Sequence, residues 1–204
     1  MPYADFSLDA LRVSFGLTIR QEPLFPNVTP VAVSPWLHET LAKGMPMALG
    51  SEKARSEFII APILLTLRDL NHNRIAIYSG QRLDGDPNVG LVGECDFLVT
   101  SSQPLPIIQA PIISVVEAKK NDIESGLGQC AAQMVGAQRF NQRDHASPIT
   151  TIYGCVTTGE VWQLLKLSEM VLVLDTQRYY INSLETILGV LQAIIHYYLP
   201  SNDV

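Results

Sequence analysis

Three ionisable side chains stand in or beside apolar, strand-like runs of the sequence. Asp96 lies inside VGECDFLV, and Glu117 and Lys119 lie at the end of SVVEAKK. Residues two apart in a strand share a face, so we expect Glu117 and Lys119 to point the same way, with Ala118 on the opposite face. A carboxylate in an apolar strand is costly unless it is paired or binds a cation. The pattern therefore predicts a polar site built on two strands.

The two apolar runs could form an antiparallel hairpin with residues 101–110 as its loop. The midpoint between Asp96 and Glu117 falls inside that loop, so the two carboxylates would lie close together across the strand pair. Two neighbouring carboxylates repel each other and favour a hard divalent cation with oxygen ligands. Lys119 could orient a water or stabilise negative charge on a phosphate. The alternative is a structural Glu–Lys pair at a strand end, with Asp96 in a turn.

Two glutamines follow in GLGQCAAQM, a segment that we expect to be helical. Gln129 and Gln133 are four residues apart and share a helix face that is separate from the apolar stripe of Leu127, Cys130 and Met134. An amide both donates and accepts hydrogen bonds, so either glutamine could hold a water or a phosphate oxygen near a metal. The alternative is an ordinary polar helix face.

Two acids and a second lysine are further candidates. Glu52 and Glu57 lie in a segment that we expect to be a helix beginning at the N-cap Ser51. Five residues of a regular helix turn a side chain by about 140°, so only one of the two acids is expected to face the site. Lys120 adjoins Lys119 and could contact a phosphate, or it could be a solvated charge at a strand end.

The rest of the sequence must supply the elements that position these side chains. Prolines are frequent in residues 1–50, which we expect to form an irregular extension packed on the core, with one short helix at Pro35–Ala42. Residues 9–19 could be a short helix or strand, and Pro62 is expected to kink the helix over 51–70 or to mark a packing contact. Further helices are expected over about 122–141 and 184–199, and strands over 74–80, 91–99, 111–119, 149–159, 160–167, 170–175 and 178–181. This order predicts an α/β or α+β domain over residues 51–204, a mixed sheet flanked by helices.

Composition and charge narrow the class of protein. The chain has 204 residues and a mass of 22.5 kDa, enough to bury one full core. Hydrophobic residues make up 47% of it, which excludes wholesale disorder. The formal net charge of −6 argues against nucleic-acid binding through bulk charge, although a local basic site in an acidic protein remains open. Weak local positive charge is expected from Lys53, Arg55, Arg139 and Arg143.

Other residue types that often do chemistry form no motif here. The three cysteines are expected to be buried and reduced, the four histidines have no metal-ligand spacing, and Trp162 is expected in the core. Phosphate-binding glycine loops and a GxSxG elbow are absent. The longest apolar run, residues 58–67, is about half a membrane span, and the N-terminus has no secretory pattern. We therefore expect a soluble, cytoplasmic protein with no membrane partner.

Four of these features in order resemble the PD-(D/E)XK nuclease superfamily, over Ser51 to about Leu167. Asp96 matches the metal-binding aspartate of that pattern, Glu117 and Lys119 its E-x-K, and Gln129 a glutamine on the following helix. SEKARSEFIIAPIL is similar to the opening helix of the nuclease domain in type I restriction-enzyme R subunits, where an acid precedes an arginine and Ile-x-Pro-x-Leu. That spacing selects Glu52 over Glu57. The E-A-K form is closest to uncharacterised bacterial members, and Cys95 stands where many members have proline.

The resemblance implies a restriction-endonuclease-like core and a metal-dependent nuclease acting on nucleic acid, DNA rather than RNA. Asp96 and Glu117 would hold Mg²⁺ or Mn²⁺, and Glu52 would add a ligand directly or through water. Lys119 would position the attacking water or stabilise charge, and Gln129 would orient the site. Lys120 and Gln133 are expected substrate contacts. Cleavage of both strands of a duplex would suggest a two-fold homodimer.

Two other functions stay open from the sequence. The fold could serve as a catalytically silent module for nucleic-acid binding or assembly, which the acidic charge favours. The site could also act on a smaller phosphoester. The retention of Asp96, Glu117 and Lys119 together favours the nuclease, because a purely structural descendant does not need all three.

Overall fold

A seven-stranded mixed sheet forms the centre of the computed structural model, which describes residues 2–143 and 149–199. The strand order is β1-β7-β6-β5-β4-β3-β2. Neighbouring strands are antiparallel except β1 with β7 and β4 with β5, which are parallel. The strands are β1 (Thr18–Glu22), β2 (Ala76–Asp86), β3 (Leu91–Thr100), β4 (Ile112–Ala118), β5 (Thr151–Thr157), β6 (Val161–Ser168) and β7 (Val171–Tyr180).

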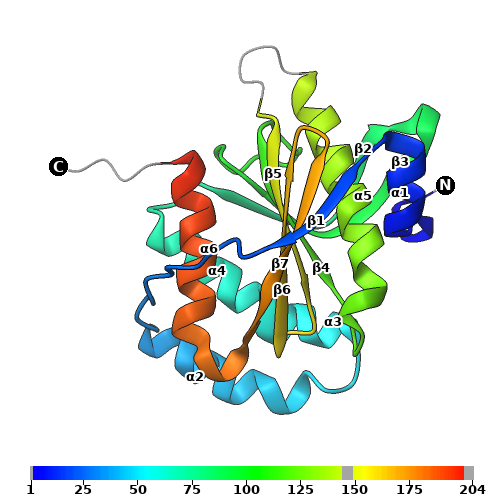
Figure 1. Ribbon diagram of the computed structural model, residues 1–204. Coiled ribbons are helices and arrows are strands. Elements are labelled where there is room, and N and C mark those ends of the chain that lie inside the picture. The colour runs from blue at the N-terminus through cyan, green and yellow to red at the C-terminus, as the bar shows by residue number, and fades with distance from the viewer. Residues whose placement is uncertain (1, 144–148, 200–204) are drawn as a thin grey trace.

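Helices cover both faces of this sheet, which confirms the predicted α/β class. In Figure 1, α5 and α1 lie on one side of the strands, and α2, α4 and α6 lie on the other. The helices are α1 (Leu8–Phe15), α2 (Pro35–Gly44), α3 (Glu52–Arg55), α4 (Ala61–Leu70), α5 (Ile123–Gln142) and α6 (Leu184–Tyr198). Within the described residues, no helix has both the length and the apolar character needed to cross a membrane.

Each face of the sheet has its own hydrophobic core. Cys130 and Met134 of α5 pack on one face with Val115 of β4, as their helical spacing predicts. On the other face Val116 packs with residues of α4 and α6 and with Trp162, which is fully buried as predicted. Because alternate residues of β4 serve opposite cores, the strand is apolar along almost its whole length. Glu117 is the one ionisable residue in this strand, and Ser114 is its other polar residue.

The helix predicted from Ser51 to Leu70 is present but contains a wider turn. Ser51 caps it, since its hydroxyl accepts a hydrogen bond from the amide of Ala54 at 3.1 Å. Residues 56–60 form a π-helical turn between α3 and α4, and Pro62 follows directly. Proline has no N–H to donate to the preceding turn, and the π-helical turn accommodates that break.

The first fifty residues are more regular than the sequence predicts. They form α1 and α2, and they add β1 to the sheet edge beside β7. Tyr3, Phe6 and Leu11 are buried in the core under α5. The strand was hard to foresee because β1 pairs with one neighbour only and four of its five side chains are exposed, which leaves no alternating pattern.

Two other boundaries differ from the prediction. Strand β2 runs on to Asp86 through residues that look like turn formers, because the β2–β3 hairpin continues as far as the pair Asp86 and Leu91. The two short strands expected over 170–175 and 178–181 are one strand, β7, which pairs with β6 across a register shift. The remaining helices and strands lie within a few residues of their predicted positions, except that the start of the strand expected over 149–159 adjoins residues outside the described range.

Candidate active site at the fork between β3 and β4

Strands β3 and β4 separate at one end, and Asp96 lies where they part. Their ladder ends with Phe97 opposite Val116, and one further step would place Asp96 opposite Glu117. Beyond that point β4 still pairs with β5 up to Ala118, while β3 still pairs with β2. The carboxylate of Asp96 takes the place of a strand partner, because its Oδ2 accepts a hydrogen bond from the amide of Ala118 at 2.7 Å.

An irregularity in β3 produces this fork. Cys95 and Leu98 both pack in the core under α5, although residues three apart in a regular strand face opposite ways. The alternation therefore slips by one residue at Asp96. Gly80, which lies across from Asp96 on β2, has a φ of 62°, a conformation that suits glycine. The local bend sets the carboxylate of Asp96 into the gap between the strands.

Glu117 is held by side chains from its own strand end and from α5. It is 2% exposed. Its Oε1 accepts a hydrogen bond from Lys119 Nζ at 2.7 Å, and its Oε2 accepts one from Gln133 Nε2 at 2.7 Å. Lys119 also donates to Gln129 Oε1 at 3.1 Å. The structure thus brings together the predicted E-x-K pair and the two predicted glutamines, Gln129 and Gln133.

Electrostatics at the fork disfavour two full negative charges. Burial, and after it the nearby charge of Asp96, raise the pKa of Glu117 to about 7 against the lowering effects of Lys119 and Gln133. Burial also raises the pKa of Asp96, against the lowering effect of the Ala118 amide. Burial alone would lower the pKa of Lys119, but Glu117, Glu52 and Asp96 outweigh it and raise that pKa. A cation between the carboxylates would relieve this repulsion.

An open pocket of about 480 Å³ lies beside Asp96, and we call it the acidic pocket. Four acids line it, together with Lys53, Ser56, Ser79 and Gly80; the acids are Glu52, Glu57, Glu94 and Asp96. Helix α3 brings in Glu52, whose Oε1 accepts a hydrogen bond from the amide of Lys120 at 3.3 Å. Glu94 was not among the predicted residues, although its position two before Asp96 in the same strand was a usable signal.

Both acids of the first helix line the acidic pocket, so the expectation that only one could face it was wrong. The helix is still α-helical between these two acids, because the amide of Ser56 donates to the carbonyl of Glu52 and the π-helical turn begins only at Ser56. The acidic pocket therefore extends over more than one side of the helix. Glu57 also lies 3.9 Å from Lys53 in an ion pair, whereas Glu52 contacts the strand end that carries the lysines.

The oxygen donors at the fork fit a hard divalent cation. Asp96 Oδ1 has no hydrogen-bond partner among the described residues, and Glu52 lines the same pocket. Mg²⁺ usually takes only one or two protein carboxylates and keeps several waters. The described residues contain no preassembled group of three or more His, Cys, Asp and Glu side chains placed to hold a metal. The donor set therefore suits a partly hydrated ion rather than an all-protein cage.

Gly126 of α5 is a site neighbour that the sequence analysis missed. A Cβ atom at this position would lie 3.1 Å from both Cγ and Cε of Lys119 and 2.6 Å from Cγ1 of Val156. Glycine therefore makes room for the lysine stem between α5 and β5. No signal in one sequence separates this packing role from the other small residues near the start of the helix.

Other predicted residues lie elsewhere. Arg139 pairs with Asp86, and Arg143 donates to the carbonyl of Gly85, so both bind the far end of β2 rather than the fork. Cys95, Cys130 and Cys155 are buried and unpaired, as expected. Lys120 is exposed beside Glu52, which leaves its side chain available to a ligand.

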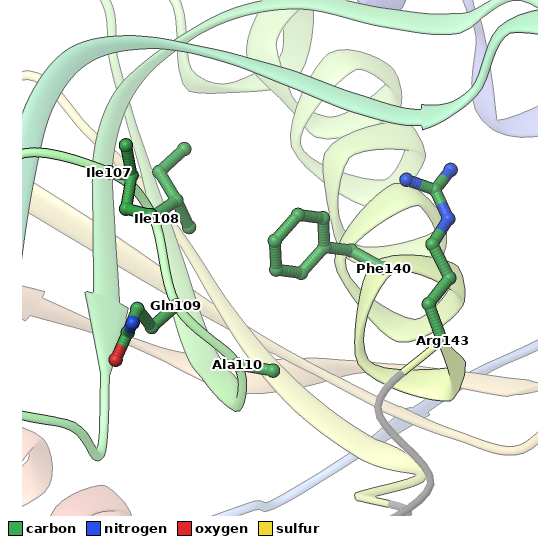
Figure 2. Close-up of a pocket in the computed structure, with 6 residues that line it drawn as sticks. All are labelled: Ile107, Ile108, Gln109, Ala110, Phe140 and Arg143. Carbon is green, nitrogen blue, oxygen red and sulfur yellow. The ribbon is translucent and has the colours of Figure 1, made fainter.

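A second open pocket, of about 460 Å³, carries no comparable chemistry. It lies between the β3–β4 loop and the end of α5. Figure 2 shows the ring of Phe140 directed toward Ile107 and Ile108, with Arg143 extending along the helix. It is lined by no acid, thiol or hydroxyl among the described residues. The fork therefore remains the candidate site.

Comparison with known proteins adds no assignment. No family model matches the chain, and it has no significant match among curated proteins or solved structures.

Proposed function

We propose that this protein is a metal-dependent nuclease that hydrolyses phosphodiester bonds of nucleic acid, DNA rather than RNA. The observation that carries the proposal is the fork, where Asp96, Glu117 and Lys119 meet beside the acidic pocket. The raised pKa of Glu117 supports it, since perturbed carboxylates cluster at functional sites. The resemblance to PD-(D/E)XK nucleases supplies the reaction class.

In this proposal Asp96 and Glu117 hold Mg²⁺ or Mn²⁺, with Glu52 adding a ligand directly or through water. The ion would polarise the scissile phosphate and lower the pKa of a water. Lys119 would hold that water or stabilise charge that develops on the phosphate. Gln129 keeps the ammonium of Lys119 in place, and Gln133 fixes the carboxylate of Glu117.

Location and assembly are part of the proposal. Three unpaired cysteines suit a reducing compartment such as the cytoplasm. A nuclease that cuts both strands of a duplex would act as a two-fold homodimer, so that one site faces each strand.

A second candidate is a catalytically silent module that binds nucleic acid. One observation favours it: both carboxylate oxygens of Glu117 already accept hydrogen bonds, from Lys119 and Gln133. A buried, fully satisfied carboxylate can serve stability of the network alone. Cleavage measurements separate the two candidates.

The test compares wild type with Lys119→Ala, Asp96→Asn and a control, Lys43→Ala, which removes an exposed lysine from α2. Plasmid, linear duplex and single-stranded DNA are incubated with Mg²⁺ or Mn²⁺, and Mn²⁺ binding is measured by calorimetry at pH 8.5. Loss of Lys119 should slow cleavage by about 10² to 10³-fold. It should leave Mn²⁺ binding nearly intact, because an ammonium is no metal ligand. Asp96→Asn should lose both cleavage and Mn²⁺ binding.

Equal cleavage by wild type and all three variants would mean that the site lies elsewhere. No cleavage by wild type on any substrate, with DNA binding retained, would favour the silent module.

A further inference from the structure

A smaller pocket of about 230 Å³ lies next to the fork, and we call it the cationic pocket. It lies where the end of β4 meets α3, the start of α5 and the turn between β5 and β6. Three cations and two carboxylates line it, with the remaining lining from Asn121, Ile123, Thr158 and Val161. The charged residues are Arg55, Lys120, Arg178, Glu124 and Glu160.

Arg55 is a buried cation whose donors are only partly used. Its side chain is 8% exposed. Nη1 donates to the carbonyl oxygen of Thr158 at 2.7 Å and lies 3.3 Å from a carboxylate oxygen of Glu160. Nε is buried without a hydrogen-bond partner in the described residues, and Nη2 has no partner there either. A buried guanidinium with unused donors is suited to accept an anion in its planar fork.

Lys120 adds an uncompensated positive charge to this pocket. No carboxylate of the described residues lies within ion-pair distance of its side chain, whereas Arg178 is paired with Glu124 and Arg55 with Glu160. When the two ion pairs are counted as neutral, the ammonium of Lys120 is the remaining charge of the pocket. Its exposed side chain is free to reach a ligand at the mouth.

The cationic pocket and the acidic pocket are neighbours with opposite charge. The hydrogen bond from the Lys120 amide to Glu52 Oε1 joins them, because Glu52 lines the acidic pocket and Lys120 the cationic one. Arg55 stands three residues after Glu52 on the same helix, so one turn of α3 contributes a residue to each of the two pockets. A ligand that spans the two must carry an anion beside a metal-binding group.

We propose that the cationic pocket binds a phosphate of the nucleic-acid chain, next to the phosphate at the fork, through Arg55 and Lys120. This rests on the proposed function, and it names a substrate subsite of the same fork. A phosphodiester backbone presents anions at regular spacing, so one phosphate can meet the metal in the acidic pocket while its neighbour meets the cations. The protein needs such a site because its net charge of −6 otherwise repels nucleic acid.

The Nε–H resonance of Arg55 reports the site directly, since a buried, unpaired N–H should shift when an anion binds. It is followed by NMR in the intact protein during titration with inorganic phosphate, and then with a ten-base-pair DNA duplex in Ca²⁺. Both should cause a saturable shift. Lys120→Ala should weaken duplex binding by about five- to tenfold at 0.1 M salt and reduce the log–log salt slope by about 0.9, the contribution of one phosphate contact. Lys43→Ala is the matched control and should change neither the duplex affinity nor the salt slope.

The outcomes separate this inference from the nuclease proposal. If the Arg55 resonance and the Lys120→Ala effect behave as expected but no DNA is cleaved, the subsite stands and the nuclease fails. If Arg55 responds to neither titrant, or Lys43→Ala weakens binding as much as Lys120→Ala, the subsite is refuted. A response to inorganic phosphate but not to the duplex would overturn the assignment to nucleic acid.

Discussion

Glu117 combines near-complete burial with a second carboxylate nearby, and its pKa rises to about 7 as a result. A group that binds its proton more tightly in the folded state opposes folding above its unfolded pKa, increasingly up to the folded one. Glu117→Gln removes that cost and keeps the shape of the side chain. Without added metal, we expect the variant to be more stable than wild type by about 1 to 3 kcal/mol at pH 8. At pH 5, only slightly above the ordinary glutamate pKa of 4.5, most of this cost has not developed, so the difference should fall below about 1 kcal/mol.

Urea unfolding at pH 5 and pH 8 measures this difference. Glu39→Gln is the control, since Glu39 is an exposed partner of Lys43 on α2. A difference that is equal at both pH values would show that Glu117 is not the group responsible.

Among the individual residues, the sequence predicted the E-x-K pair well, because strand alternation alone puts Glu117 and Lys119 on one face. It placed Asp96 correctly beside Glu117 because hairpin register follows from chain distance. It failed for Glu57, since the acidic pocket extends over more than one side of the helix, which helix periodicity alone does not show.

Helix α5 is the element that holds the site together, and three of its glycines allow its close approach to neighbours. A Cβ atom at Gly128 would overlap the carbonyl oxygen of Phe6 and lie 2.8 Å from Cα of Ser7. Both are backbone atoms, so the contact cannot be relieved by a rotamer change. The N-terminal segment would have to move.

We therefore expect Gly128→Ala to lower the free energy of unfolding by about 1 to 3 kcal/mol through overpacking. Alanine would otherwise favour a helix by about 1 kcal/mol. Gly50→Ala is the matched control, because a Cβ atom there meets nothing within 4 Å. Urea unfolding of both variants checks the prediction, and a Gly128→Ala protein as stable as wild type would contradict the packing seen at this helix.

The main elements were predictable from periodicity, and the β3–β4 hairpin most clearly, because each strand is short, apolar and flanked by turn residues. The edge strand β1 was not, since its parallel partner β7 lies some 150 positions later and its own side chains are mostly exposed. Nothing local distinguishes it from a proline-rich extension.

For the whole molecule, residues 1–50, which the sequence predicts as an irregular extension packed on the core, lead to a direct experimental test. Residues 1–50 are tied to the rest at several places: β1 pairs with β7, and Leu37 and Leu41 of α2 pack in the core against α4. The amide of Val31 donates to the carbonyl of Glu185 at 2.9 Å. Their removal would expose apolar surface on both faces of the sheet.

A chain that begins at Ser51 should therefore fail to fold as an independent domain. We expect it to lack the sharp urea transition of the full chain, because the apolar faces of α4 and α5 lose their partners while the conformational entropy cost of the remaining residues is unchanged. Circular dichroism should show residual helix without cooperative unfolding. A chain that begins at Pro35, and so keeps α2 but not β1 or α1, should recover the α4-side core only and unfold at lower urea than the full chain. If the chain from Ser51 instead unfolds at the same urea concentration as the full protein, the first fifty residues are an appendage, and the edge strand contributes nothing to the stability of the fork.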